Sequence, residues 1–142
     1  MLRGASAEAQ AQLISELEGA QGDAGKLGEE LLGVAAVLRS EAALRRIATD
    51  ASVEPEAKAG LAADVFRNAL GEIALGLVTS AVQHRWTSPR DLADVIEDLG
   101  VLAAVRSAGD DGRLISDELF EVRRVIDEAD GLRTALTERA AA

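Results

Sequence analysis

Apolar residues recur along much of the chain at spacings of three and four, which is the period of one face of an α-helix. The clearest case follows Ser88-Pro89-Arg90-Asp91, a start signal with a capping Ser, a Pro at the first helical position and a carboxylate three residues after the cap. We therefore predict a long helix that begins at this signal. Its apolar stripe runs through Leu92, Val95, Ile96, Leu99, Leu102 and Val105.

Two further helices are predicted before residue 40. Ser6 is a candidate cap for a first helix that reaches about Glu18, and the glycines that follow end it. A second helical stripe runs from Lys26 to Arg39. Ser40 is a candidate break, since its hydroxyl can accept a hydrogen bond from the backbone of a new helix.

Between residues 41 and 83 the pattern predicts three more helices. The first of these is short and ends near Asp50. Pro55 fits the first turn of the next helix, because its missing N–H would be unpaired there in any case. We expect the buried side of that helix to hold Leu61, Val65 and Phe66. A turn at 68–71 then leads into a fifth helix, whose apolar positions are Ile73, Leu77, Val78 and Val82.

Strands have no support in this sequence. No segment alternates apolar and polar residues for long, and β-branched residues never cluster. Helices of about 8 to 20 residues joined by short loops favour a compact bundle over one long coiled coil. The predicted fold is all-α: a compact antiparallel six-helix bundle with one or two additional C-terminal helices, the first of them opened by Ser116.

An internal repeat predicts how the chain is divided. Shifted by 88 residues, Glu30-Leu31 aligns with Glu118-Leu119 and Leu38 aligns with Ile126. Chance similarity between two Ala-rich helices is the alternative, but the match spans two helices and their junction.

From the repeat we predict an N-terminal helical bundle at 1–109. Residues 110–142 would be a linker and the two-helix beginning of a second, incomplete repeat copy. Helices of such a copy would lack the partners that cover their apolar faces. We therefore expect the tail at 114–137 to dock on the bundle, to pair with another molecule or to fray.

Charge and composition narrow the functions that the chain can have. Its 142 residues include 25 acidic and 15 basic side chains, for a net charge of −10, which repels phosphate backbones and anionic lipid surfaces. We expect no nucleic-acid binding, and because no apolar run approaches about 20 residues, no direct membrane insertion. The chain has no Cys and one His, which excludes disulfides, thiolate nucleophiles and metal sites that need two imidazoles.

No group of residues predicts an enzyme site. His84 follows Ser80 at a helical spacing, but no oxyanion site accompanies them, and a His at a polar helix end suits the helix dipole. Asp110-Asp111-Gly112 resembles part of a calcium loop without the later alternating oxygens, so a solvated turn is the simpler interpretation. Trp86 is expected to anchor one end of the bundle through its indole N–H, with a partner contact as the alternative. No catalytic residue, metal ligand or cofactor is predicted.

Two predicted helices carry more apolar positions than one packing seam needs. A groove between the first and the fifth helix could therefore accept an amphipathic helix from a partner. The alternative is that these apolar residues pack on one another. The candidate partner-binding residues are Leu13, Ile14, Leu17, Ile73, Leu77, Val78 and Val82.

Two segments resemble a known family. Residues 44–61, LRRIATDASVEPEAKAGL, are similar to the LRRxLxDPSVxxEAKxxL segment of the δ subunits of bacterial F-type ATP synthase, relatives of the oligomycin-sensitivity-conferring protein. The family's later LVxxLVxxxRxxxLxxVxxxF segment is matched from Leu77 to Leu99. Residues 2–6 and 85–92 resemble actinobacterial members in particular. Ala5 departs from the family, because many members have a Tyr at that position.

This resemblance implies a function as well as a fold. It implies a non-catalytic peripheral-stalk (stator) subunit at the top of F1, whose six-helix bundle grips N-terminal helices of the α subunits between its first and fifth helices. Such a subunit resists rotor torque, so that proton flow stays coupled to ATP synthesis. It also implies a peripheral location on the cytoplasmic face of the bacterial cell membrane. A stator b-type subunit would bind the carboxy-terminal part of the family, which we expect to be missing here. The alternative function is a helical regulatory adaptor or partner-switching protein that binds an amphipathic helix.

Overall fold

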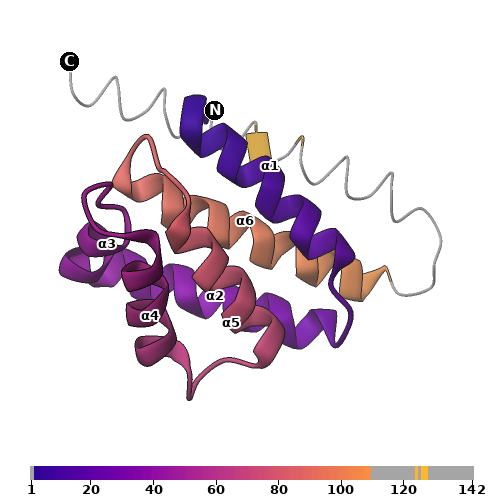
Figure 1. Ribbon diagram of the computed structural model, residues 1–142. Coiled ribbons are helices and arrows are strands. Elements are labelled where there is room, and N and C mark those ends of the chain that lie inside the picture. The colour runs from indigo at the N-terminus through magenta and orange to yellow at the C-terminus, as the bar shows by residue number, and fades with distance from the viewer. Residues whose placement is uncertain (1, 110–123, 125, 128–142) are drawn as a thin grey trace.

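The described part of the chain is built from helices alone. The computed structural model describes residues 2–109, 124, 126 and 127, and six helices with no strand fill the first of these ranges (Figure 1). This confirms the predicted all-α bundle. The helices are α1 (Gly4–Gly19), α2 (Ala24–Ser40), α3 (Ala42–Ala48), α4 (Pro55–Phe66), α5 (Glu72–Gln83) and α6 (Pro89–Ala108).

Most of the predicted second segment lies outside the described residues. Of 110–142 only Arg124, Ile126 and Asp127 are described, and these three are helical. The helix opened by Ser116 and the Asp110-Asp111-Gly112 turn both fall outside. The division of the chain at residue 109 therefore stays a prediction.

The longest two helices, α2 and α6, form the most extensive helix pair in the structure. They run antiparallel, since Gly28 lies against Gly100 and Ala104 while Arg39, near the other end of α2, pairs with Asp94. A Cβ atom added to Gly28 would lie 2.9 Å from the carbonyl oxygen of Gly100. The two backbones can approach this closely only because neither glycine has a side chain.

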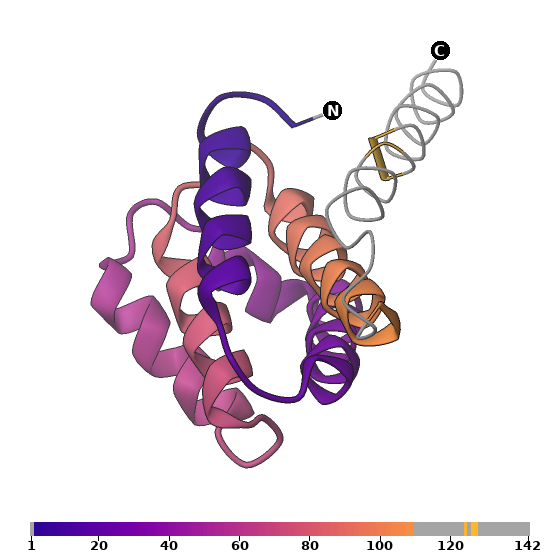
Figure 2. The same ribbon diagram turned by 90° about the vertical axis from the view of Figure 1, so that its right-hand side faces the viewer.

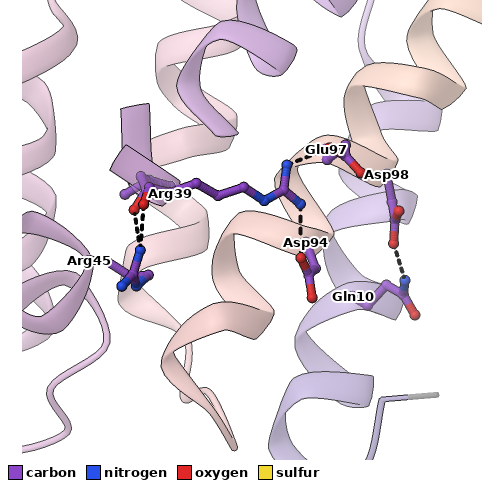
Figure 3. A network of polar contacts seen from close by, with 7 residues as sticks. Gln10, Arg39, Arg45, Asp94, Glu97 and Asp98 are labelled. Atoms are coloured by element: carbon purple, nitrogen blue, oxygen red, sulfur yellow. Dashed lines mark hydrogen bonds and ion pairs between the residues drawn. The ribbon is translucent and has the colours of Figure 1, made fainter. Parts of the chain in front are cut away.

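Arginines secure the end of this pair where α2 meets α3 (Figure 3). Arg39 binds the carboxylates of both Asp94, at 2.8 Å, and Glu97 on α6. Arg45 of α3 donates from Nη1 to the carbonyl oxygens of Leu38 and Arg39, each at 2.9 Å. The last turn of α2 is thus satisfied by a cation, as the helix dipole favours.

The remaining helices enclose an aliphatic core. The helices α1 and α6 run parallel, because Ser6 bonds Asp91 near their starts and Arg106 bonds the carbonyl of Leu17 near their ends. α1 and α5 are antiparallel, and α4 forms a helical hairpin with α5 (Figures 1 and 2). The largest fully buried apolar side chains are Leu13, Leu31, Leu38, Leu92, Ile96, Leu99, Val34, Val78 and Val95.

The buried side of α4 differs from the prediction. Phe66 is buried, but Leu61 is only half-buried and Val65 is 46% exposed. The inward line of α4 is instead Lys58, Ala62 and Phe66, which recur every four residues. The prediction counted apolar residues only. It therefore missed the buried face of α4, because one of the three residues on that face is a lysine.

The predicted helix caps are also partly wrong. Ser40 donates its hydroxyl to the carbonyl of Val37, so it closes α2 and does not cap α3. Ser88 is the N-cap residue of α6 without a side-chain cap bond, and the Asp91 carboxylate accepts from Ser6. Pro55 does begin α4, which confirms that part of the prediction.

The close approach of α2 and α6 gives a direct test of what holds the fold. Gly28→Ala would push a methyl group against backbone atoms of α6 that cannot move aside, and we expect it to lower the free energy of unfolding by about 1–3 kcal/mol. Gly33→Ala is the matched control on α2, because nothing lies within 4 Å of its added Cβ. The control should raise stability by roughly 0.5–1 kcal/mol through helix propensity. Urea unfolding followed by circular dichroism measures both, and equal effects would contradict the packing constraint.

Lys58 gives a second test, through pH. It lies 4% exposed beside a small apolar cavity lined by Leu38, Phe66 and Val78 among others. Burial lowers the pKa of its ammonium group, Asp50 opposes this and Arg85 adds to it. A lysine whose pKa falls on folding destabilises the folded state while it is charged, and this cost disappears as pH rises through the folded pKa to the ordinary lysine pKa.

We therefore expect Lys58→Met to raise the free energy of unfolding by about 0.5–1 kcal/mol near pH 7. The gain should shrink as pH approaches the ordinary lysine value, because wild-type stability rises there. Lys26→Met, at an exposed position, is the control and should change little at any pH. Thermal unfolding at several pH values measures the difference. A gain that does not depend on pH would show that packing, and not charge, is the cause.

Candidate functional site

The predicted partner-binding residues come together on α1 and α5, but most of them face inward. Leu13, Leu17 and Leu77 are at most 5% exposed, and Ile14, Val78 and Val82 are also buried. Ile73 is the exception, at 36% exposed. Six of the seven therefore belong to the hydrophobic core of the bundle, as in the alternative in which these residues pack on one another. Whether the helices that carry them contact a partner stays a prediction.

A polar clasp fixes the start of α1 against the start of α6. The Ser6 hydroxyl, fully buried, donates to Oδ2 of Asp91 and accepts from the backbone N–H of Thr87, both at 2.7 Å. The Thr87 hydroxyl in turn donates to the carbonyl of Arg3 at 2.8 Å. Ser6 therefore joins two helices and does not cap one.

Further polar bonds hold α1 along its length. Gln10 donates from Nε2 to Asp98 of α6 at 3.2 Å (Figure 3). On the other flank, the Ser80 hydroxyl of α5 bonds the Glu16 carboxylate at 3.0 Å. These partners are distant in sequence, so a search for local motifs misses them. The one available signal was a serine, Ser6, on the same helix face as buried apolar residues.

The outer surface of α1 and α5, termed here the α1–α5 surface, consists of Glu16, Ile73, Gly76 and Ser80. Ile73 lies beside Gly22, whose φ of 132° suits glycine alone. Next to Ile73 is an open hollow of about 290 Å³ between the α1–α2 connection, α2 and the start of α5. Gly76 is exposed, with nothing within 4 Å of an added Cβ. The backbone of α5 is therefore approachable from outside at this point.

The start of α5 is held electrostatically. The Glu30 carboxylate of α2 accepts a hydrogen bond from the backbone N–H of Gly71, the N-cap residue of α5. An anion at a helix N-terminus is favourable because unpaired N–H groups and the helix dipole are positive there. This contact gives Glu30 a structural role, and it fixes the turn that precedes Ile73.

The described residues show no arrangement for catalysis. Ser80 bonds Glu16, so its hydroxyl is engaged away from His84, which is the C-cap residue of α5. Among residues 2–109, 124, 126 and 127, no three His, Asp or Glu side chains form a group that could hold a metal ion. Trp86 donates its indole N–H to the carbonyl of Ala81 at 2.9 Å, which confirms its predicted role as an anchor at the end of the bundle.

The proteins to which this sequence is similar share one name, ATP synthase subunit delta. The chain is 45% identical over 96% of its length to the ATP synthase subunit delta of a Nocardioides species. It is 39% identical over 98% of its length to the ATP synthase subunit delta of Streptomyces avermitilis, and 35% identical over 97% to that of Nocardia farcinica. The chain belongs to the family of ATP synthase subunit delta. No family model matches it.

The similarity covers only part of each relative. The chain spans about half the length of these δ subunits, 51% of the Nocardioides protein and 52% of the other two. Within the described residues, no helix combines the length and the apolar character needed to cross a membrane. Membership of the δ family identifies the chain with an ATP synthase subunit.

The hydrogen bonds of the Ser6 hydroxyl should contribute measurably to the stability of α1 in the bundle. Ser6→Ala leaves the Thr87 N–H without its acceptor and the Asp91 carboxylate without its donor. We expect a loss of about 1–3 kcal/mol in the free energy of unfolding. Ser15→Ala, at an exposed position of the same helix, should change stability by less than about 0.5 kcal/mol. Hydrogen exchange at the amides of α1 would locate the effect, and unchanged exchange there would contradict the clasp.

Proposed function

We propose that this chain is part of a non-catalytic stator subunit of F1Fo ATP synthase. In this role it binds N-terminal helices of the α subunits at the top of F1 and resists rotor torque, so that proton flow stays coupled to ATP synthesis. The observation that carries the proposal is the 45% identity to an ATP synthase subunit delta over 96% of the chain. The complex would place it at the cytoplasmic face of the bacterial cell membrane, as a peripheral protein.

The α1–α5 surface is the proposed contact for the α subunit. An amphipathic helix binds by placing side chains at spacings of three and four against an apolar strip. Ile73 offers an exposed apolar side chain, and Gly76, one helical turn further on, lets a partner approach the α5 backbone. The buried candidates, Leu13, Ile14, Leu17, Leu77, Val78 and Val82, contribute by fixing the distance between α1 and α5.

Charge and stiffness support the same proposal. The whole chain has a net charge of −10, and Glu16 and Glu72 are exposed on α1 and α5, so a partner helix with basic flanks would be attracted. A stator must also transmit force without deforming. The α2–α6 pair, with backbones in contact at Gly28 and arginine bonds at one end, provides a rigid strut.

The stator b-type subunit is the second proposed partner. The family resemblance implies that it binds a carboxy-terminal region, so no residue of the bundle at 2–109 is assigned to it. The two partner contacts can therefore be tested separately.

Binding of a synthetic peptide tests the first contact. The peptide has the sequence of the amino terminus of the α subunit from the same genome. We expect Ile73→Asp to weaken its binding by about tenfold or more, since loss of a central apolar contact exceeds about 1 kcal/mol. Gly76→Arg should also weaken binding, because a long side chain would stand where the partner helix approaches.

Val65→Asp is the matched control for these variants. Val65 is an exposed apolar residue, 46% exposed, on α4, which lies away from α1 (Figure 1). It should leave the affinity unchanged, as measured by isothermal titration calorimetry. Circular dichroism confirms the fold of each variant. Equal affinity for all three variants would remove the α1–α5 surface from the proposal, whereas no binding to the parent chain would contradict α-subunit binding itself.

The second candidate function is a helical regulatory adaptor that binds an amphipathic helix. It uses the same surface chemistry and differs only in the partner. Affinity purification followed by mass spectrometry separates the two candidates. Recovery of α, β and γ subunits supports the stator, and recovery of a polymerase-associated protein supports the adaptor.

A further inference from the structure

An open hollow lies between α1 and α6, on the flank of α1 that faces away from α5. Its volume is about 370 Å³. Residues of α1, residues of α6 and two residues from far along the chain line it together. The two distant residues are Ile126 and Asp127.

The floor of this hollow is apolar and its rim is polar. Ile14 of α1 and Leu102 of α6 form the floor, and both are buried. On one side of the hollow, Gln10 donates a hydrogen bond of 3.2 Å to the carboxylate of Asp98. Glu18 stands on the rim. Such a site suits an apolar side chain with a charged or polar flank.

We propose that this hollow is the docking seat for the helical turn around Ile126. Ile126 lines the hollow and is half-buried, whereas Arg124 and Asp127 on the same turn are exposed. Of the three described residues of this turn only the isoleucine is apolar, so its burial gives them a preferred orientation toward the bundle. The occupant is thus the chain's own later segment, held against α1 and α6.

The sequence repeat independently marks Ile126 as an anchor position. At the offset of 88 residues it aligns with Leu38 of α2, which is 1% exposed in the core of the bundle. A position that carries a core residue in the first copy carries an apolar residue again in the second. The proposal gives that residue a burial site within this chain.

Charge contributes little to this docking. The seat carries Glu18 and Asp98, while the docking turn carries both Arg124 and Asp127, and it is Asp127 that lines the hollow. Attraction of the arginine and repulsion of the aspartate oppose each other, and exposed charge pairs contribute little in any case, so the burial of Ile126 carries the proposal.

A cysteine pair tests the docking directly, because the chain has no Cys of its own. The full 142-residue chain carries Ala11→Cys and Asp127→Cys, two substitutions at exposed positions that line the hollow. Under mild oxidation at low protein concentration, we expect an intramolecular disulfide to form about tenfold faster than in the control pair. The control combines Asp127→Cys with Glu56→Cys, an exposed position on α4.

Mass spectrometry and gel mobility distinguish the outcomes of this experiment. Equal rates for the two pairs would overturn the proposal. Disulfides formed only between molecules would overturn it too, and would assign the hollow to a second copy of the chain.

A labelling experiment tests whether Ile126 is the anchor of the docked turn. With Ala11→Cys alone, docking should slow reaction of the thiol with a maleimide by about threefold or more, since Ala11 and Asp127 line the same hollow and the docked turn hinders approach of the reagent. Ile126→Asp should remove this protection, and Ile126→Leu should keep it. Equal labelling in all three chains would show that Ile126 does not dock. Neither experiment involves another subunit of ATP synthase, so failure here leaves the proposed function untouched.

Discussion

The contact between Gly28 and the backbone of α6 at Gly100 is the constraint on which the rest of the structure depends. It brings the two longest helices together at a distance that side chains would forbid, and α1, α3 and α5 all pack against the resulting pair. Such an approach replaces a layer of large side chains with direct backbone contact, which suits a chain whose core is aliphatic and contains few aromatic residues. The arginines at 39 and 45 add polar bonds where α2 ends. The positions of α1, α3 and α5 therefore depend on one close helix pair.

The helix α1 depends on polar bonds to a greater degree than the others. Its buried face holds Ala9 and Ser6 beside the larger Leu13, Ile14 and Leu17, so the apolar area that it contributes near its start is small. Ser6, Gln10 and Glu16 supply bonds to α6 and α5 that specify one position for the helix. Apolar packing alone is non-directional and would allow α1 to slide. The polar bonds are therefore what gives the α1–α5 surface a defined shape.

The sequence predicted the helices well and the orientation of side chains less well. The starts of α4 at Pro55 and of α6 at Pro89 could be predicted because proline lacks an N–H and is favoured in the first turn of a helix. The apolar stripe of α6 from Leu92 to Leu102 is buried, as its helical period predicts. The burial of Val65 was wrongly predicted because Lys58 occupies the inward face of α4 instead, and a count of apolar residues ignores that a lysine can bury its aliphatic stem. The burial of Leu13 and Leu77 could not be predicted, since it depends on which neighbours meet across the bundle. The bonds of Ser6 and Glu16 join residues more than 60 positions apart, and local patterns carry no information about such pairs.

The two surfaces beside α1 can be occupied at the same time. The α1–α5 surface involves Glu16 on one flank of α1, whereas Ala11 and Glu18 line the hollow on the other flank. Coupling between the two sites requires that each ligand binds one position of α1 more tightly than another, and such a coupling is reciprocal. A turn docked at Ile126 would then strengthen a partner bound along α5 without touching it. The size of that effect is limited by how far α1 can move, and the bonds at Ser6, Gln10, Glu16 and the Leu17 carbonyl hold this helix from its start to its end.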